Sequence, residues 1–80
     1  MTVNKLTRTL KAKGYKMASY ILWSYNLFND VIYTDYVKDE KLAMSIKRVK
    51  GAIETQVVFI SKHFKEEFKE MGIELGTILK

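Results

Sequence analysis

The chain has 80 residues and a formal net charge of +5, and 48% of its residues are hydrophobic, which is enough for one compact core. The absence of cysteine excludes disulfides, thiolate metal sites and cysteine nucleophiles. The longest charge-free stretch, residues 17–29, is shorter than the roughly 20 apolar residues of a membrane span, and no targeting segment is recognisable near the start. The composition therefore predicts a single cytoplasmic domain, residues 1–80, without a membrane span.

A short basic helix is predicted over residues 3–13. Val3, Leu6 and Leu10 recur at spacings of three and four residues, as the buried side of a helix requires. Gly14 then provides a left-handed stop at the C-terminal end.

An aromatic-rich central helix is predicted from about residue 15 to residue 33. Seven of the ten aromatic residues lie between positions 15 and 36, and apolar side chains occur on nearly every side of a helix drawn through this segment. The rest of an 80-residue chain is too small to cover all of them. Because tyrosine and tryptophan dominate interface hot spots, we predict that this helix meets another chain, in the simplest case a second copy in a two-fold homodimer. The interface side chains would be Tyr20, Trp23, Leu27 and Val31.

A long amphipathic third helix is predicted from about residue 39 to residue 71. Apolar residues recur along it at spacings of three and four, with an average period of about 3.6 residues, the value of a straight α-helix. This stripe consists of Leu42, Ile46, Val49, Ile53, Val57, Ile60, Phe64, Phe68 and Met71. Asp39 and Glu40 would form an acidic first turn, and Gly72 would end the helix.

A β-strand is the alternative for residues 54–61. Residues 57–60 are β-branched or aromatic, which favours a strand, and residues 73–79 could pair with it. The helical period of the longer segment favours the helix. The expected fold is therefore all-α: a small helical bundle with a short basic N-terminal helix, an aromatic-rich central helix and a long amphipathic third helix, associating as a dimer.

Positive charge is concentrated in the first 16 residues, which hold five cations and no acid, so this segment alone has the net charge of the whole chain. A second basic cluster lies opposite the apolar stripe of the expected third helix. Lys and Arg bind nucleic-acid phosphates by displacing condensed counterions, although a basic face on a small protein is also ordinary solvated surface. The residues that would contact phosphates or an acidic partner are Lys5, Arg8, Lys11, Lys47, Arg48 and Lys50.

Three more specific binding modes fit the pattern less well. The order of elements around Gly14 is that of a helix-turn-helix, but the second segment lacks exposed polar residues that could read base edges. An aromatic platform for single-stranded bases would need basic residues among its rings, and residues 17–29 contain none. The apolar stripe of the first helix is too narrow to anchor it on a membrane surface.

The chain shows no catalytic signature. It has one histidine and no Gly-rich phosphate loop. On the expected third helix His63, Glu67 and Glu70 would share a face and could begin a divalent-metal site. An ordinary solvated face, on which Lys62 pairs with Glu66, is the simpler interpretation. We therefore expect no enzyme activity, no catalytic residues, no metal and no cofactor.

These patterns favour a non-catalytic interaction protein: a small adaptor, inhibitor or regulatory subunit that binds a macromolecular partner through the aromatic helix and the basic surface. The alternative function is low-specificity nucleic-acid binding through the basic N-terminal helix and residues 47–50. Lysine outnumbers arginine twelve to two, which indicates an AT-rich coding genome and suits a phage or mobile element.

Overall fold

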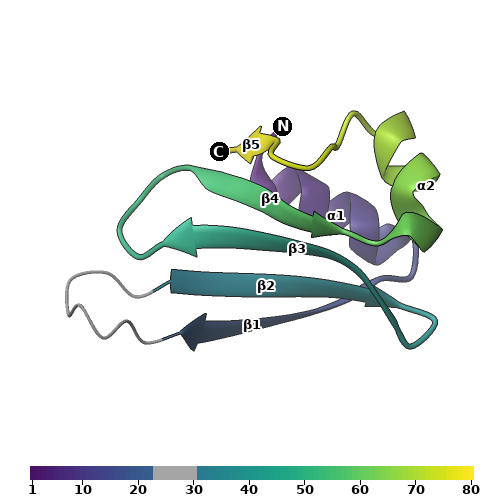
Figure 1. Cartoon of the computed structure of the whole chain (residues 1–80), viewed down its shortest axis with the longest axis horizontal. Coiled ribbons are helices and arrows are strands. Elements are labelled where there is room, and N and C mark those ends of the chain that lie inside the picture. Colours follow the sequence, from purple (N-terminus) through teal and green to yellow (C-terminus); the bar gives the residue numbers. More distant parts are fainter. Residues whose placement is uncertain (23–30) are drawn as a thin grey trace.

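The computed structural model describes residues 1–22 and 31–80. In that part of the chain, a five-stranded antiparallel sheet in the order β1-β2-β3-β4-β5 carries one helix on a face and another at an end (Figure 1). The elements in chain order are α1 (Val3–Ala12), β1 (Lys16–Leu22), β2 (Val31–Lys38), β3 (Lys41–Val49), β4 (Thr55–Ile60), the 3-10 turn η1 (Lys62–Phe64), α2 (Lys65–Glu70) and β5 (Ile78–Leu79). The prediction of an all-α helical bundle is therefore wrong.

The predicted basic N-terminal helix is confirmed as α1. The Thr2 side chain caps it by accepting a hydrogen bond from the Lys5 N–H (3.1 Å). Leu6 and Leu10 are fully buried. Gly14 follows with a φ of +92°, a left-handed conformation that glycine adopts without steric cost.

The predicted central helix is instead a pair of strands. β1 and β2 run antiparallel, with Tyr20 opposite Tyr33. A strand sends alternate side chains to opposite faces, so apolar residues on every side of a helical projection are equally compatible with a strand. Tyrosine, isoleucine, valine and threonine also favour the pleated conformation. Residues 23–30, which include the predicted interface residues Trp23 and Leu27, lie outside the described residues.

The predicted long third helix is also wrong. β3 and β4 pair antiparallel across most of this segment, and only Lys65–Glu70 is α-helical within it. Gly51, with a φ of +87°, lies in the turn between the two strands rather than inside a helix. β4 pairs with β5, with Thr55 opposite Leu79, which confirms the strand alternative for residues 54–61.

The helical spacing in this segment combines residues from two faces of the sheet. Ile46 and Val57 lie opposite each other on one face. Val49 pairs with Val31 on the other face, as Leu42 does with Val37. Register shifts within both strand pairs interrupt the alternation further, because a bulge inserts an extra residue. The result imitates a period of about 3.6 residues without any helix.

Asp39 and Glu40 form the turn between β2 and β3 instead of the first turn of a helix. Their φ values are +53° and +62°, so both residues adopt the left-handed conformation. Two successive residues of this kind are typical of a tight hairpin connection. Glycine or asparagine would have signalled such a turn, whereas an Asp-Glu pair does not.

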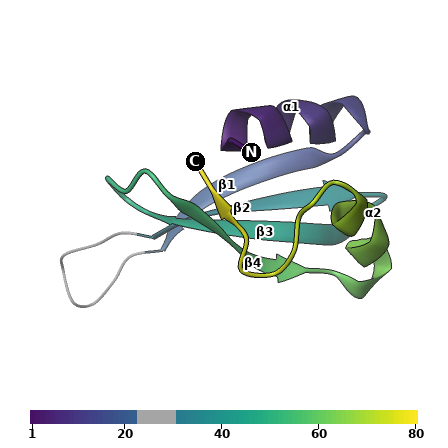
Figure 2. The same ribbon diagram turned by 90° about the horizontal axis from the view of Figure 1, so that it is seen from above.

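One face of the sheet packs against α1, and we call it the helix-covered face (Figure 2). Tyr36 lies opposite Met44 on this face. The Tyr36 hydroxyl and the Thr7 Oγ1 of α1 are 2.9 Å apart, which links the helix to the sheet. The buried hydrophobic residues form one cluster, consisting of Leu6, Leu10, Tyr15, Tyr36, Ala43, Met44, Ile46, Val57, Phe64, Phe68, Ile73 and Leu79.

The opposite face, which we call the open face, has no helix over it in the described part of the chain (Figures 1 and 2). A row of side chains crosses all five strands on this face, because each residue is the register partner of the next. The row consists of Tyr20, Tyr33, Lys47, Gln56 and Ile78.

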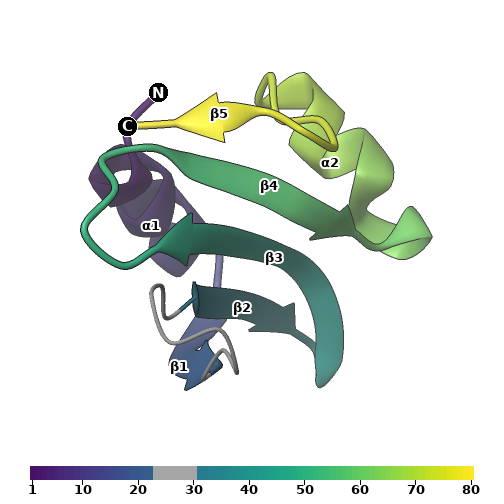
Figure 3. The same cartoon turned by 60° about the vertical axis from the view of Figure 1, so that its left-hand side comes forward.

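The two edges of the sheet differ. The two ends of the chain lie side by side next to β5 (Figure 3), where the Val3 N–H donates to the Lys80 oxygen (2.9 Å) and the Lys80 N–H donates to the Met1 oxygen (3.4 Å). At the other edge, no described strand lies beyond β1.

Candidate binding surfaces

The solvent-facing side of α1 and of its C-terminal cap is a basic surface, which we call the α1 ridge. It consists of Lys5, Arg8, Lys11 and Lys13. All four are exposed, and none forms an ion pair with another described residue. The first 22 residues contain no acid. The ridge faces solvent because the two buried leucines of the helix occupy its other side.

The three other predicted phosphate contacts do not share a face. Lys47 lies on the open face opposite Tyr33, whereas Arg48, the next residue, lies opposite Ile32 on the helix-covered face. Lys50 follows β3 in the turn. The expected cluster is absent because a strand alternates its faces where a helix would have kept these residues together. Arg48 is thus on the same side of the sheet as α1, and Lys47 is not.

Two of the four predicted interface residues, Tyr20 and Val31, lie together on the open face. The Tyr20 ring stacks on Tyr33 of the neighbouring strand, with ring centroids 5.6 Å apart and ring planes 16° apart. The predicted residues therefore share a surface, although strands rather than a helix place them there. The other two belong to residues 23–30.

The open face also carries large apolar side chains that the sequence analysis did not assign to a binding surface. Leu42, Phe59 and Ile78 are 42%, 41% and 47% exposed. Phe59 lies on this face opposite Ser45. Apolar residues at every second position of a short strand would have identified these side chains, but the register shifts interrupt that alternation.

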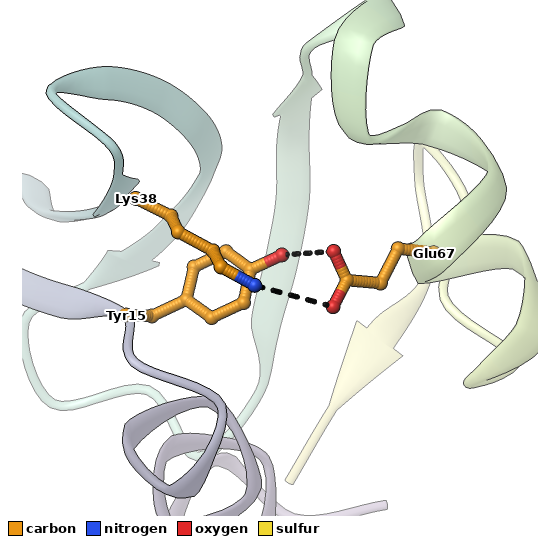
Figure 4. Close-up of polar contacts among 3 residues, drawn as sticks. All are labelled: Tyr15, Lys38 and Glu67. Carbon is orange, nitrogen blue, oxygen red and sulfur yellow. Dashed lines mark hydrogen bonds and ion pairs between the residues drawn. The ribbon is translucent and has the colours of Figure 1, made fainter.

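Tyr15, Lys38 and Glu67 join three segments at one end of the sheet (Figure 4). The Tyr15 hydroxyl donates to Glu67 Oε2 (2.7 Å), and Lys38 Nζ lies 3.9 Å from Glu67 Oε1 and 5.1 Å from the centroid of the Tyr15 ring. Burial of Tyr15, followed by its hydrogen bond to the Glu67 carboxylate, raises the pKa of the hydroxyl far above its ordinary value. A tyrosine held protonated in this way serves as a structural hydrogen-bond donor between the start of β1 and α2.

Two of the three side chains considered for a metal site have other partners. Glu67 belongs to the Tyr15 cluster, and the His63 ring packs edge-on against Phe64 with centroids 4.9 Å apart. The described residues contain no group of three or more His, Cys, Asp or Glu side chains that could hold a metal ion. Among the same residues, no helix has the length and apolar character that would let it cross a membrane.

Two hollows open on the surface. One, of about 490 Å³, lies beside α2 and includes Lys62, Lys65 and Lys69 in its lining. The other, of about 380 Å³, lies on the helix-covered face beside the start of α1 and includes Arg48 and Thr55. No sequence motif indicated either of them.

Comparison with known proteins assigns no family to the chain. A scan against protein-family models and searches of curated proteins and of solved structures returned no match. Its function must therefore be inferred from the surfaces themselves.

Proposed function

We propose that this protein is a non-catalytic nucleic-acid-binding module of low sequence specificity, which contacts phosphates through the α1 ridge. The proposal rests on the ridge cations: four exposed basic side chains lie on one short helix and its C-terminal cap, and none has an acidic partner among the described residues. Unpaired charges of one sign repel each other, and a bound polyanion relieves that repulsion.

A nucleic-acid backbone fits the ridge better than an acidic protein surface does. Protein interfaces depend on large apolar or aromatic anchors. The exposed residues of α1 are Asn4, Lys5, Arg8, Lys11 and Ala12, and none of them is large and apolar. Phosphate binding needs no such anchor, because the release of condensed counterions supplies the affinity. Contacts to phosphates also carry no direct sequence information, which accounts for the low specificity.

The salt dependence of binding to a fluorescently labelled mixed-sequence DNA duplex, followed by anisotropy, tests this proposal. We expect the logarithm of the affinity to fall linearly with the logarithm of the salt concentration. The triple variant Lys5→Gln/Arg8→Gln/Lys11→Gln should make that slope less negative by about 2–3 units, since each phosphate contact contributes about 0.9.

A charge-matched control separates the ridge from net charge. Lys62→Gln/Lys65→Gln/Lys69→Gln removes the same three charges from η1 and α2. It should change the slope by less than about 1 unit. Equal losses of slope in the two triple variants, or no binding of the wild type at low salt, would contradict the proposal.

Protein binding through the open face is the second candidate function, and the exposed apolar side chains of that face favour it. Tyr20 and Phe59 are 44% and 41% exposed there, and extended apolar patches mark interaction sites. The simplest partner is a second copy, because no other described strand pairs with the outer edge of β1, and this edge can pair with another β1 about a two-fold axis. An adaptor, inhibitor or regulatory subunit would present the same surface to a different protein.

Sedimentation equilibrium tests the homodimer. We expect the wild type to be dimeric and Tyr20→Lys to be monomeric, because a charge on an edge strand opposes edge-to-edge pairing. Ala12→Lys, which adds the same charge to the exposed surface of α1 on the other side of the sheet, should remain dimeric. A wild type that stays monomeric at the highest soluble concentration would rule the homodimer out.

A further inference from the structure

The hollow beside the start of α1 has one cationic group assigned to its wall, Arg48 of β3, and no acidic side chain lines it. Lys80 also lines it, and its main-chain oxygen accepts from the Val3 N–H (2.9 Å) at the start of the helix. Asn4 also lines it, and its N–H belongs to the first turn of α1, where no intrahelical acceptor exists. The N-terminal end of the helix dipole adds to the attraction for negative charge.

Thr55 is an independent indication of a ligand. Its side chain is 4% exposed, yet its hydroxyl has no hydrogen-bond partner among the described residues. Ser45, the other buried serine or threonine among the described residues, donates to Asp35 Oδ1 (2.7 Å). Every described side-chain nitrogen or oxygen that is fully buried has a hydrogen-bond partner. Because the Thr55 hydroxyl oxygen has none, it must be accessible to solvent. Thr55 lines this hollow. Its hydrogen bond is therefore available to a molecule in the hollow.

Two further hydroxyls lie in the same wall. Ser19 Oγ and Thr34 Oγ1 are 2.8 Å apart, and both residues line the hollow. Whichever hydroxyl donates in that bond, the other keeps its hydrogen for a third group. The hollow thus combines the Arg48 guanidinium with several neutral donors, which suits a ligand rich in acceptors.

The remaining wall is apolar. It is formed by Val3, Ile32, Ile46 and Ile53. An inorganic anion would leave these side chains in contact with water, whereas a ligand with a short aliphatic body would cover them. The volume of about 380 Å³ is at the lower end of the range for small-molecule sites, about 300–1,000 Å³.

We infer that this hollow binds a small carboxylate with an aliphatic body. The carboxylate pairs with Arg48 and accepts from Thr55, while the aliphatic chain lies on the isoleucine side chains. The site does not depend on nucleic-acid binding, because none of the four α1 ridge residues lines it.

Amide NMR titration of the full chain tests the inference with three probes: hexanoate, 1-hexanol and inorganic phosphate. We expect hexanoate to cause saturable shifts confined to amides around the hollow, among them those of Asn4, Thr34 and Thr55, with a dissociation constant on the order of 1 mM. Hexanol lacks the charge and phosphate lacks the aliphatic body, so each should bind at least about tenfold more weakly.

Three single variants locate the interaction. Arg48→Gln and Thr55→Val should each weaken hexanoate binding, the arginine variant by about tenfold, because it removes a charge-assisted hydrogen bond. Lys69→Gln, which lines the other hollow, is the matched control and should bind as the wild type does. The amide spectra themselves report whether each variant is folded.

Several results would overturn the inference. These are shifts that do not saturate, shifts spread along the α1 ridge, or hexanoate affinity unchanged in both folded variants. Phosphate binding as tight as that of hexanoate would show a simple anion site, and equally tight hexanol binding would show a purely apolar one. Either outcome contradicts a site that recognises both the carboxylate and the aliphatic body of the ligand.

Discussion

The helix-covered face and the open face are made by the same strands, but they differ in what touches them. On β3, Met44 is fully buried beneath α1, whereas Leu42, two positions earlier, is 42% exposed. On β4, Val57 is 1% exposed and Phe59 is 41% exposed. A register shift lies between the two residues of each pair, so they occupy opposite faces although they are two positions apart. Burial then follows the face, because α1 covers one face of the sheet and not the other.

The two faces therefore contribute to different properties: the helix-covered face to the stability of the fold, and the open face to the recognition of a partner. Apolar side chains on the helix-covered face and under α2 form the buried cluster, and their removal from water stabilises the fold. Apolar side chains on the open face stay hydrated and remain available to a partner. The charged surface of α1 points away from both, which leaves it available to a polyanion.

The largest expected effect comes from truncating matched residues on the two faces. Met44→Ala should lower the free energy of unfolding by about 2–5 kcal/mol, because it leaves a cavity in the buried cluster. Leu42→Ala should cost less than about 1 kcal/mol, since much of that side chain is already in water. Urea unfolding followed by circular dichroism measures both, and equal losses would show that the open face is covered in solution.

A smaller effect is expected at the cluster that ties α2 to the start of β1. Tyr15→Phe should cost about 1–2 kcal/mol at neutral pH, because it removes a hydrogen bond to a carboxylate that is still partly exposed. The raised pKa of Tyr15 also makes the stability pH-dependent. The folded state keeps this proton when the unfolded chain, with its ordinary tyrosine pKa of 10.0, has lost it.

The stability contributed by Tyr15 is thus complete below pH 10 and declines as the pH rises above it. Urea unfolding between pH 8 and pH 11 should show a steeper decline for the wild type than for Tyr15→Phe. Parallel declines in the two proteins would contradict the raised pKa.

The hydrogen bond that joins α1 to the helix-covered face is expected to contribute less. Thr7→Val removes the partner of the Tyr36 hydroxyl and should cost about 0.5–1.5 kcal/mol. Thr9→Val is the control on the same helix, because the Thr9 hydroxyl donates only to the Lys5 oxygen within α1 (2.9 Å), and its effect should be near zero. Thermal unfolding of both variants checks this, and equal melting temperatures would contradict it.

The smallest effect is expected from the stacked tyrosines of the open face. A double-mutant cycle with Tyr20→Ala and Tyr33→Ala should give a coupling energy of about 0.2–1 kcal/mol, as cross-strand aromatic pairs do. A larger coupling would show that a partner buries the pair. Repeating the cycle at several protein concentrations would identify self-association as the cause.

Only part of the fold could be predicted from the sequence. α1 was predictable because its three apolar residues, its cap and Gly14 all indicate the same helix. The strand at residues 54–61 was offered as an alternative, because residues 57–60 are β-branched or aromatic, and it is confirmed as β4, paired with β5. The strands β1 and β2 were not predicted, because the aromatic segment has apolar residues at both odd and even positions. The turn at Asp39 and Glu40 lacks glycine, so the chain shows no local sign of reversal there.

The candidate sites were predictable to a similar extent. Lys5, Arg8 and Lys11 lie together because they belong to the helix that was predicted correctly. Lys47 and Arg48 lie apart because a strand replaced the expected helix. The hollow at Thr55 had no sequence signal, since its lining comes from α1, four strands, the turn before β4 and the last residue of the chain.

The amino-acid sequence by itself determined that this protein has a basic, cysteine-free chain and an N-terminal helix with one buried side and one charged side. These properties depend on composition and on contacts between residues three or four positions apart, which local chain geometry controls. The tertiary structure alone decided which strands pair, which face α1 covers and which hydroxyl is left without a partner. Those outcomes depend on contacts between residues far apart in the chain, such as Thr7 with Tyr36 and Tyr15 with Glu67, and no local pattern encodes them.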